Sequence, residues 1–237
     1  MNDVVRVTGL QFAWSDAGPT VLDIEGLRIG QGERIFVSGA SGSGKSTLLN
    51  LLAGTISPDV GTVEIGGTDI AALRGGARDS FRADRIGFIF QMFNLVPYLS
   101  VMENVSLPCR FSAGRRKKAE ARSGTVASEA RLLLAAMQLD GNVLDARSVT
   151  RLSVGQQQRV AAARALIGAP PLVIADEPTS SLDENARRHF IDLVFAEVSR
   201  AGSTLVFVSH DQTLAPMFDR TIRLEKTNRA AFPGGSA

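Results

Sequence analysis

Eight consecutive residues, Gly39 to Ser46, form a glycine-rich octet (GASGSGKS) that ends in lysine and serine. The octet follows a compact apolar run, Ile35 to Val37, and precedes a leucine-rich stretch with helical spacing. Glycines at these positions let the backbone wrap a pyrophosphate with its N–H groups pointing inward, and the following helix adds the positive end of its dipole. The octet therefore predicts a phosphate loop (P-loop) that binds a nucleotide.

Two side chains of this loop are expected to do chemistry. Lys45 would reach the terminal phosphates, and the hydroxyl of Ser46 would bind Mg²⁺. A merely flexible Gly/Ser turn, the alternative, would not need lysine and serine at these positions. The residues predicted to contact ATP in this loop are Gly39, Ala40, Ser41, Gly42, Ser43, Gly44, Lys45, Ser46 and Thr47.

Two adjacent carboxylates, Asp176 and Glu177, follow a second apolar run, Leu172 to Ala175. Asp176 can hold Mg²⁺ through its water shell, because hard cations prefer oxygen ligands. Glu177, one residue further on, would face the γ-phosphate and polarise an attacking water, and loss of such a base typically costs about 10²–10⁴ in rate. The alternative is an acid pair that caps the start of a helix before Pro178.

The elements that must position these groups alternate along the chain. A buried strand at 172–175, a helix at 184–200 and a second buried strand at 204–208 follow one another. Near-continuous apolar runs separated by helices favour an α/β fold with a parallel sheet covered on both faces. Residues 92–167 are expected to be mostly helical, and further short strands are expected at 4–7, 21–24, 35–37, 62–65 and 86–90.

Composition limits the class of protein. Of 237 residues, 44% are hydrophobic and 21% are charged, a composition that excludes intrinsic disorder. The net charge of +2 is too small to indicate a nucleic-acid-binding protein. The single cysteine, Cys109, excludes an internal disulfide and favours a reducing compartment. Neither a secretory signal nor a membrane-spanning run is found. The most polar run, Gly114 to Lys118, is expected to be a solvated helix start or loop.

The stretch Leu152 to Arg159 (LSVGQQQR) resembles the signature motif of ATP-binding-cassette (ABC) ATPases, and it stands upstream of the Asp-Glu strand as in that family. Four further motifs match in the family's order and extend the resemblance over residues 10–211. Trp14 resembles the adenine-stacking aromatic, Gln91 the Q-loop glutamine, Asp183 the D-loop aspartate and His210 the switch histidine. The resemblance covers nearly the whole chain.

The resemblance implies a P-loop NTPase (RecA-like) core with an N-terminal antiparallel β subdomain and an inserted α-helical subdomain. The nucleotide-binding core with its β subdomain would comprise residues 1–91 and about 168–228. The helical subdomain, with the signature motif, would comprise about 92–167. The tail, 229–237, is expected to be frayed.

The resemblance also implies catalytic roles for Glu177, His210 and Gln91. Gln91 would join Mg²⁺ and the attacking water to the partner interface, and it would bind the metal together with Ser46 and Asp176. Each assignment has an alternative. Trp14 could pack in the core, Gln91 could be an exposed loop amide, and His210 could be a structural histidine at a strand end.

The signature segment implies an assembly. Ser153 is a good N-cap, and a helix from Gly155 would direct free N–H groups at an anion. In ABC proteins that anion is the γ-phosphate of ATP on the opposite subunit's P-loop, so one P-loop and one signature per chain imply a head-to-tail homodimer on ATP binding. The contacts with the partner's ATP are expected from Ser153, Val154, Gly155 and Gln156.

Val154 departs from the family pattern, which usually has a glycine at this position. A β-branched side chain resists positive φ and takes up room near the phosphate, so slowed hydrolysis is expected. This departure is the only support for a binding-only regulatory cassette, a reading that Glu177 and His210 oppose.

Residues 86–97 and 101–108 resemble the ABC subfamily that serves lipoprotein release, macrolide and peptide export, and cell division. The resemblance implies a cassette that docks on a separate integral membrane permease at the cytoplasmic face of the inner membrane and drives export or mechanical transmission. The residues expected near the permease are Phe93, Leu95, Pro97 and Tyr98, unless they form subdomain core.

The rival function is a soluble ABC ATPase that acts on nucleic acid or a protein machine. The stretch between the P-loop and the signature has no sustained heptads, and no base-stacking aromatic cluster is found. No nucleic-acid partner is therefore expected.

Overall fold

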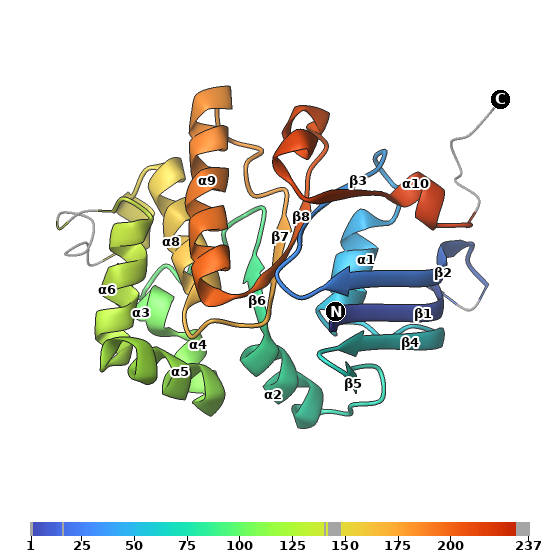
Figure 1. Cartoon of the computed structure of the whole chain (residues 1–237), viewed down its shortest axis with the longest axis horizontal. Coiled ribbons are helices and arrows are strands. Elements are labelled where there is room, and N and C mark those ends of the chain that lie inside the picture. Colours follow the sequence, from blue (N-terminus) through green and yellow to red (C-terminus); the bar gives the residue numbers. More distant parts are fainter. Residues whose placement is uncertain (1, 16, 140, 142–147, 231–237) are drawn as a thin grey trace.

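Two β-sheets face each other across one helix, and a group of helices extends from the far side of the second sheet (Figure 1). This computed structural model describes residues 2–15, 17–139, 141 and 148–230. The expected frayed tail lies outside the described residues from position 231 onward, but fraying is wrong for its first two residues. The N–H of Arg229 donates to the Asp23 carbonyl (2.8 Å), and the N–H of Ala230 donates to the Asn228 Oδ1 (3.1 Å). Among the helices described, none has the length and apolar character needed to cross a bilayer.

The first sheet is antiparallel, with the strand order β2-β1-β4-β5. Its strands are β1 (Asp3–Ala13), β2 (Thr20–Gly30), β4 (Val60–Ile65) and β5 (Thr68–Asp69). Along β1 the buried side chains include Val5, Val7, Leu10 and Phe12, which face the interior of the molecule. The antiparallel β subdomain that the family resemblance implies is therefore present.

The second sheet is parallel throughout, with the strand order β6-β7-β8-β3-β9. Its strands are β3 (Arg34–Ser38), β6 (Ile86–Ile89), β7 (Leu172–Asp176), β8 (Thr204–Val208) and β9 (Arg220–Arg223). β8 is buried along its whole length, as expected for a central strand covered on both faces. The predicted parallel sheet is confirmed.

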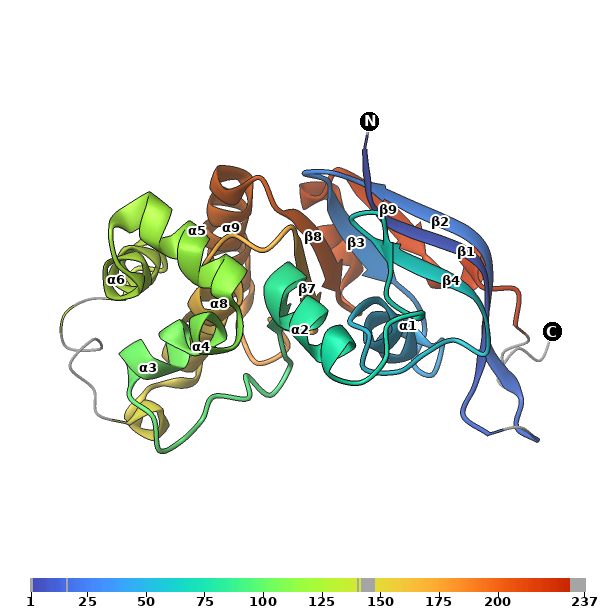
Figure 2. The same cartoon turned by 90° about the horizontal axis from the view of Figure 1, so that it is seen from below.

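Helix α1 (Lys45–Leu52) lies between the two sheets (Figure 2). Its leucines are almost fully buried and belong to one apolar cluster with residues of β1, β2 and β3. A second cluster covers the other face of the parallel sheet and joins it to the helices. The N-terminal end of α1, which follows the P-loop, is thus fixed by packing on both sides of the helix.

The helices expected within residues 92–167 and over 184–200 are present, whereas the helices at 76–85, 212–217 and 224–227 were not predicted. The stretch from 101 to 166 holds α3 (Val101–Ser106), α4 (Pro108–Phe111), α5 (Ala113–Ser123), α6 (Val126–Ala136), the 3₁₀ turn η1 (Val149–Arg151) and α8 (Val154–Leu166). Outside it lie α2 (Gly76–Arg85), α9 (Glu184–Ala201), η2 (Gln212–Met217) and α10 (Leu224–Thr227). The exact residues that divide core from helical subdomain stay a prediction.

The basic run Gly114 to Lys118 opens helix α5, as expected, but it is not wholly solvated. Arg115 is only 2% exposed. It donates hydrogen bonds to the carbonyls of Ala165 (2.5 Å) and Ile167 (2.8 Å), at the end of α8. The last carbonyls of a helix have no intrahelical partner, so this buried guanidinium supplies one. Burial lowers the pKa of Arg115 to about 10.

Gly87, in β6, lies so close to α8 that it has no room for a side chain. A Cβ at this position would clash with the carbonyl oxygen of Ala165, and it would stand 3.1 Å from Pro170. We expect Gly87→Ala to lower the free energy of unfolding by about 1–3 kcal/mol through overpacking, measured by urea denaturation. Gly26→Ala is the control, because a Cβ there meets nothing within 4 Å. Equal losses in the two variants would contradict this close approach.

Candidate functional site

The loop between β3 and α1 depends on glycine at three positions. Gly42 (φ 78°) and Gly44 (φ 93°) are left-handed, and a Cβ on Gly44 would stand 2.8 Å from a methyl carbon of Leu22. A Cβ on Gly39 would clash with the hydroxyl of Ser43. Within the described structure, no side chain caps the start of α1. The backbone N–H groups of this helix end are therefore available to an anion.

Lys45 folds back over its own loop. Its Nζ donates hydrogen bonds to the carbonyl oxygens of Gly39 (2.7 Å) and Ala40 (2.8 Å). These two bonds hold the loop closed around the ammonium group. They are also bonds that an arriving phosphate could replace, because phosphate oxygens accept from ammonium more strongly than neutral carbonyls do.

The end of β7 brings Asp176 and Glu177 to the same place. Burial raises the pKa of Asp176, the negative charge of Glu177 raises it further, and the Lys45 ammonium opposes both. Glu177 is left-handed (φ 46°), and its N–H donates to the carbonyl of Val208 (3.0 Å). Such a conformation is strained in a residue other than glycine, and strain of this kind persists where the surroundings hold it.

His210, which follows β8, contacts Glu177 directly. Its Nδ1 lies 2.7 Å from the Glu177 Oε2. The helix-capping alternative for the acid pair is wrong, because Asp183 caps the next helix, α9, by accepting a hydrogen bond from the Ala186 N–H (2.9 Å). The two carboxylates at the end of β7 are therefore free to face the phosphate loop.

One cavity of about 530 Å³ gathers these groups. Twelve residues line it: Trp14, Val21, Ser41, Gly42, Gly44, Lys45, Ser46, Thr47, Gln91, Asp176, Glu177 and His210. The remaining predicted P-loop contacts, Gly39, Ala40 and Ser43, do not line it. The predicted signature and D-loop residues lie outside this cavity.

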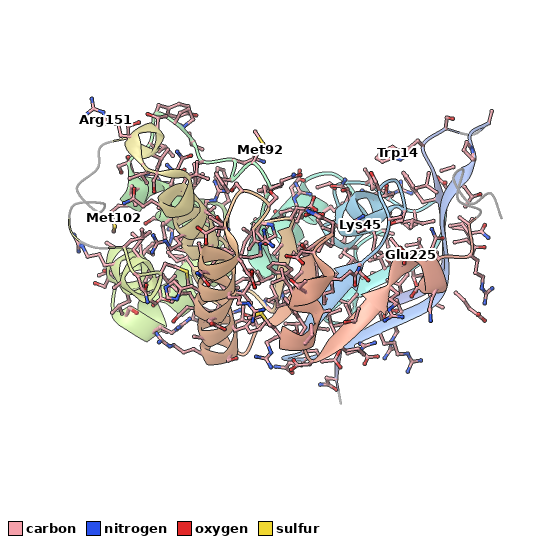
Figure 3. The ribbon with its side chains drawn as sticks, turned by 90° about the horizontal axis from the view of Figure 1, so that it is seen from above. Trp14, Lys45, Met92, Met102, Arg151 and Glu225 are labelled. Carbon is pink, nitrogen blue, oxygen red and sulfur yellow. The ribbon has the colours of Figure 1, made fainter. Side chains whose placement is uncertain are left out.

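Trp14 stands at the end of β1 and is 62% exposed, so the core-packing alternative is wrong. Its ring meets Phe12 edge-on, with the ring centroids 5.0 Å apart. Figure 3 shows Trp14 on the same end of the molecule as Lys45. A largely exposed aromatic ring held at the rim of a polar cavity is suited to stack on a base.

The signature segment begins α8 with a complete capping box. The Ser153 Oγ accepts from the Gln156 N–H (3.3 Å), and the Gln156 Oε1 accepts from the Ser153 N–H (2.9 Å). Val154, the first helical residue, does not have a positive φ, and its side chain is 49% exposed. The expected backbone penalty is therefore wrong, because a helix start needs only ordinary φ. The slowed hydrolysis expected from the bulk of the valine side chain near the phosphate stays a prediction.

Arg164, near the end of α8, is a functional candidate that the sequence analysis missed. Its guanidinium donates to the carbonyls of Asn94 and Phe93, both at 2.6 Å. These two residues follow Gln91 and are both left-handed (φ 48° and 58°). Burial lowers the pKa of Arg164 to about 10. The available signal was a charge within the apolar second half of the helix, Val160 to Leu166, since a buried charge requires partners.

A second cavity, of about 480 Å³, lies beside Gln91 between β6, α2 and α4. Its lining includes Phe88, Phe90, Leu107, Pro108, Phe111 and Arg164. Phe88 and Phe90 stack with their centroids 4.2 Å apart, and Phe111 is 71% exposed. We name this cavity the aromatic groove. No signal in the linear sequence placed Phe111 near Phe90.

None of the four predicted docking residues lines the aromatic groove. Pro97 and Tyr98 are exposed nearby along the chain, whereas Phe93 and Leu95 are half-buried. Leu95 packs against the helical core, as the core alternative required. The contact of these four residues with a permease stays a prediction.

Comparison with known proteins decides the family. A family profile described as "ABC transporter" matches residues 22–180. The chain belongs to the ABC transporter family. It is an ATP-binding cassette that hydrolyses ATP to ADP and phosphate, and the resemblance first indicated by Leu152–Arg159 is confirmed.

This ABC cassette has relatives along nearly its whole length. The lipoprotein-releasing system ATP-binding protein LolD 1 of Caulobacter vibrioides is 38% identical over 99% of both chains. LolD of Anaeromyxobacter dehalogenans is 43% identical over 88% of this chain and 85% of its own. The dimeric, post-hydrolysis structure of the ATP-binding cassette MJ0796 bound to ADP and Pi has a TM-score of 0.78 at 32% identity, covering 92% of this chain and 93% of that one.

Substitution of Trp14 tests its place at the rim of the cavity. Stacking on a base is worth roughly 1–3 kcal/mol, so we expect Trp14→Ala to raise the KM for ATP by about 5- to 150-fold with little change in kcat, measured by phosphate release. Trp14→Phe, the control, keeps an aromatic face and should stay close to wild type. An unchanged KM in Trp14→Ala would contradict the assignment.

Proposed function

We propose that this cassette binds Mg-ATP in the cavity between Trp14 and the P-loop, with adenine on Trp14 and the phosphates on the loop. The supporting observation is that groups from the ends of four strands line one cavity with the open end of α1. Lys45 is the group that would move from the loop carbonyls to the terminal phosphates. The ammonium group therefore has hydrogen-bond acceptors both without and with ATP.

The donors near the loop also fit Mg²⁺. Ser46, Gln91 and Asp176 line the same cavity and offer a hydroxyl, an amide oxygen and a carboxylate, the oxygen ligands that this cation prefers. When bound, Mg²⁺ neutralises charge on the phosphate oxygens. The raised pKa of Asp176 is consistent with this role, because a buried carboxylate next to another carboxylate favours a bound cation.

The proposed catalytic base is Glu177, oriented by His210. The 2.7 Å contact between their side chains limits the positions that the carboxylate can take. Phosphoryl transfer depends mainly on positioning and electrostatic stabilisation, so a base whose backbone and side chain are both held suits the reaction. Gln91, which lines the same cavity from the end of β6, completes the proposed catalytic set.

We infer that two chains close over two ATP molecules in a head-to-tail homodimer. The support is the capped start of α8, where Ser153, Val154, Gly155 and Gln156 present a helix N-terminus at the surface. A Cβ on Gly155 would meet only Leu182, at 3.9 Å, so space is open in front of it. The dimeric structures of the similar cassette MJ0796 support a dimer. Asp183 would lie at this interface as the D-loop residue.

We further propose that the cassette serves a lipoprotein-releasing system and acts on a membrane permease as a mechanical drive. The support is the nearly full-length similarity to LolD proteins. The permease would dock a short apolar helical segment in the aromatic groove, beside the exposed Met92 and Tyr98. Such docking would hold the cassette at the cytoplasmic face of the inner membrane.

The variant Glu177→Gln tests the proposed base. We expect ATP hydrolysis to fall by about 10²–10⁴ while ATP binding persists, so that dimers accumulate with ATP and can be detected by light scattering. Glu184→Gln, at the exposed start of α9, is the control and should hydrolyse ATP normally. Rapid turnover by Glu177→Gln would assign the base to another residue.

The aromatic groove is tested by affinity capture from detergent-solubilised membranes with ATP present. The Glu177→Gln cassette should retain a permease with a large extracytoplasmic domain, and addition of Phe111→Asp should abolish its recovery, because the groove loses its apolar lining. Leu132→Asp, an exposed site on α6, is the control.

Each other result of this capture has a definite meaning. Recovery of a many-helix solute permease would contradict the lipoprotein-release assignment. Equal recovery by Phe111→Asp and Leu132→Asp would remove the groove as the docking site.

A further inference from the structure

The short helix α10, close to the end of the described chain, contacts the back of the P-loop. Leu224 is fully buried, and its Cβ lies 3.4 Å from the point where a Gly39 Cβ would stand. The next residue, Glu225, accepts a hydrogen bond at its Oε1 from the backbone N–H of Ala40 (2.7 Å). Figure 3 shows Glu225 near Lys45, on the same end of the molecule.

The Ala40 peptide is therefore held from two sides by opposite charges. Its carbonyl accepts from the Lys45 ammonium (2.8 Å), while its N–H donates to the Glu225 carboxylate. Hydrogen bonds to ionised groups are stronger than neutral ones. If Lys45 moves to the phosphates of ATP, the carbonyl loses its partner, and Glu225 is the charged contact that stays with this part of the loop.

The same C-terminal segment also holds the strand beside Trp14. Asn228, 4% exposed, donates from Nδ2 to the carbonyl of Val21 (2.8 Å) and accepts at Oδ1 from the N–H of Asp23 (2.7 Å). The Arg229 N–H donates to the Asp23 carbonyl (2.8 Å). Val21 lines the nucleotide cavity. Residues 224–229, which we name the brace, thus join the phosphate loop to the hairpin of β1 and β2.

We propose that Glu225 is a positioning residue for ATP, and that the brace sets the separation between the phosphate loop and the hairpin that carries Trp14. The proposal rests on the proposed nucleotide site. Positioning of this kind affects how well ATP is bound before the reaction, since Glu225 does not line the cavity where Glu177 and His210 lie.

Steady-state kinetics of Glu225→Ala test this proposal. Loss of one hydrogen bond at an exposed site should raise the KM for ATP by about 5-fold, with kcat within about twofold of wild type. Glu225→Gln keeps an acceptor oxygen and should restore most of the wild-type KM. Lys226→Ala, on the same helix, is the control. Thermal unfolding is followed in parallel, because a merely structural role would lower Tm and leave KM unchanged.

Two results would overturn the proposal. The first is an unchanged KM in Glu225→Ala, which would mean that the carboxylate does not help to bind ATP, or a lowered KM, which would mean that it repels the phosphates. The second is equal KM values in Glu225→Ala and Glu225→Gln, which would mean that the acceptor is irrelevant. If Trp14→Ala raises the KM for ATP and Glu225→Ala does not, the proposed nucleotide site is supported and only the role of Glu225 is rejected.

The contact of the brace with the hairpin that carries Trp14 is tested by a double-variant cycle. Asn228→Ala should raise the KM for ATP in the wild-type background and should have no further effect in a Trp14→Ala background, because it acts through the hairpin. Glu225→Ala should raise the KM in both backgrounds. An Asn228→Ala effect that persists without Trp14 would contradict the coupling to the hairpin.

Discussion

The carboxyl ends of parallel strands meet at one edge of a sheet, and the arrangement of this site depends on that constraint. β3 leads into the P-loop, β7 ends at Asp176, β8 ends before His210, and β6 ends before Gln91. Far-separated parts of the chain therefore face one another. The helices that cover the sheet also pack closely, and Gly87 cannot carry a side chain where β6 passes α8.

Much of this arrangement could be predicted from sequence, because each strand is a short apolar run that ends in a polar or glycine residue. The phosphate loop, the carboxylates of β7 and the N-cap of α8 each depend on residues that are adjacent in the sequence. Such local preferences agree with the final fold in natural proteins, so they can be predicted without knowing the contacts between distant segments. One part of the Val154 expectation, the backbone penalty of a positive φ, failed for a local reason as well, whereas the expected slowing of hydrolysis stays a prediction. A position that looks like a glycine position in a motif proved to be an ordinary first residue of a helix.

What the sequence could not predict are contacts between residues far apart in the chain. Arg115 and Arg164 each satisfy backbone carbonyls of other segments, and neither has a motif that names its partner. Phe111 reaches the groove beside Phe90 only because α4 packs near α2 and β6. Glu225 is recognisable only once Ala40 is seen beside it. Among these residues only Arg164 had a usable signal in the sequence, because it is a charged residue within an apolar stretch of a predicted helix.

The hydrogen bonds of Arg164 connect the loop beside the aromatic groove with the helix that begins at the signature segment. Its guanidinium holds the two left-handed residues after Gln91, and its Cα belongs to the helix that starts at Ser153. An α-helix rises about 1.5 Å per residue, so Arg164 and Ser153 stand about 16 Å apart along a stiff rod. Through these two hydrogen bonds, a displacement of the loop beside the aromatic groove would be transmitted to α8 and would shift Ser153 at the other end of the helix.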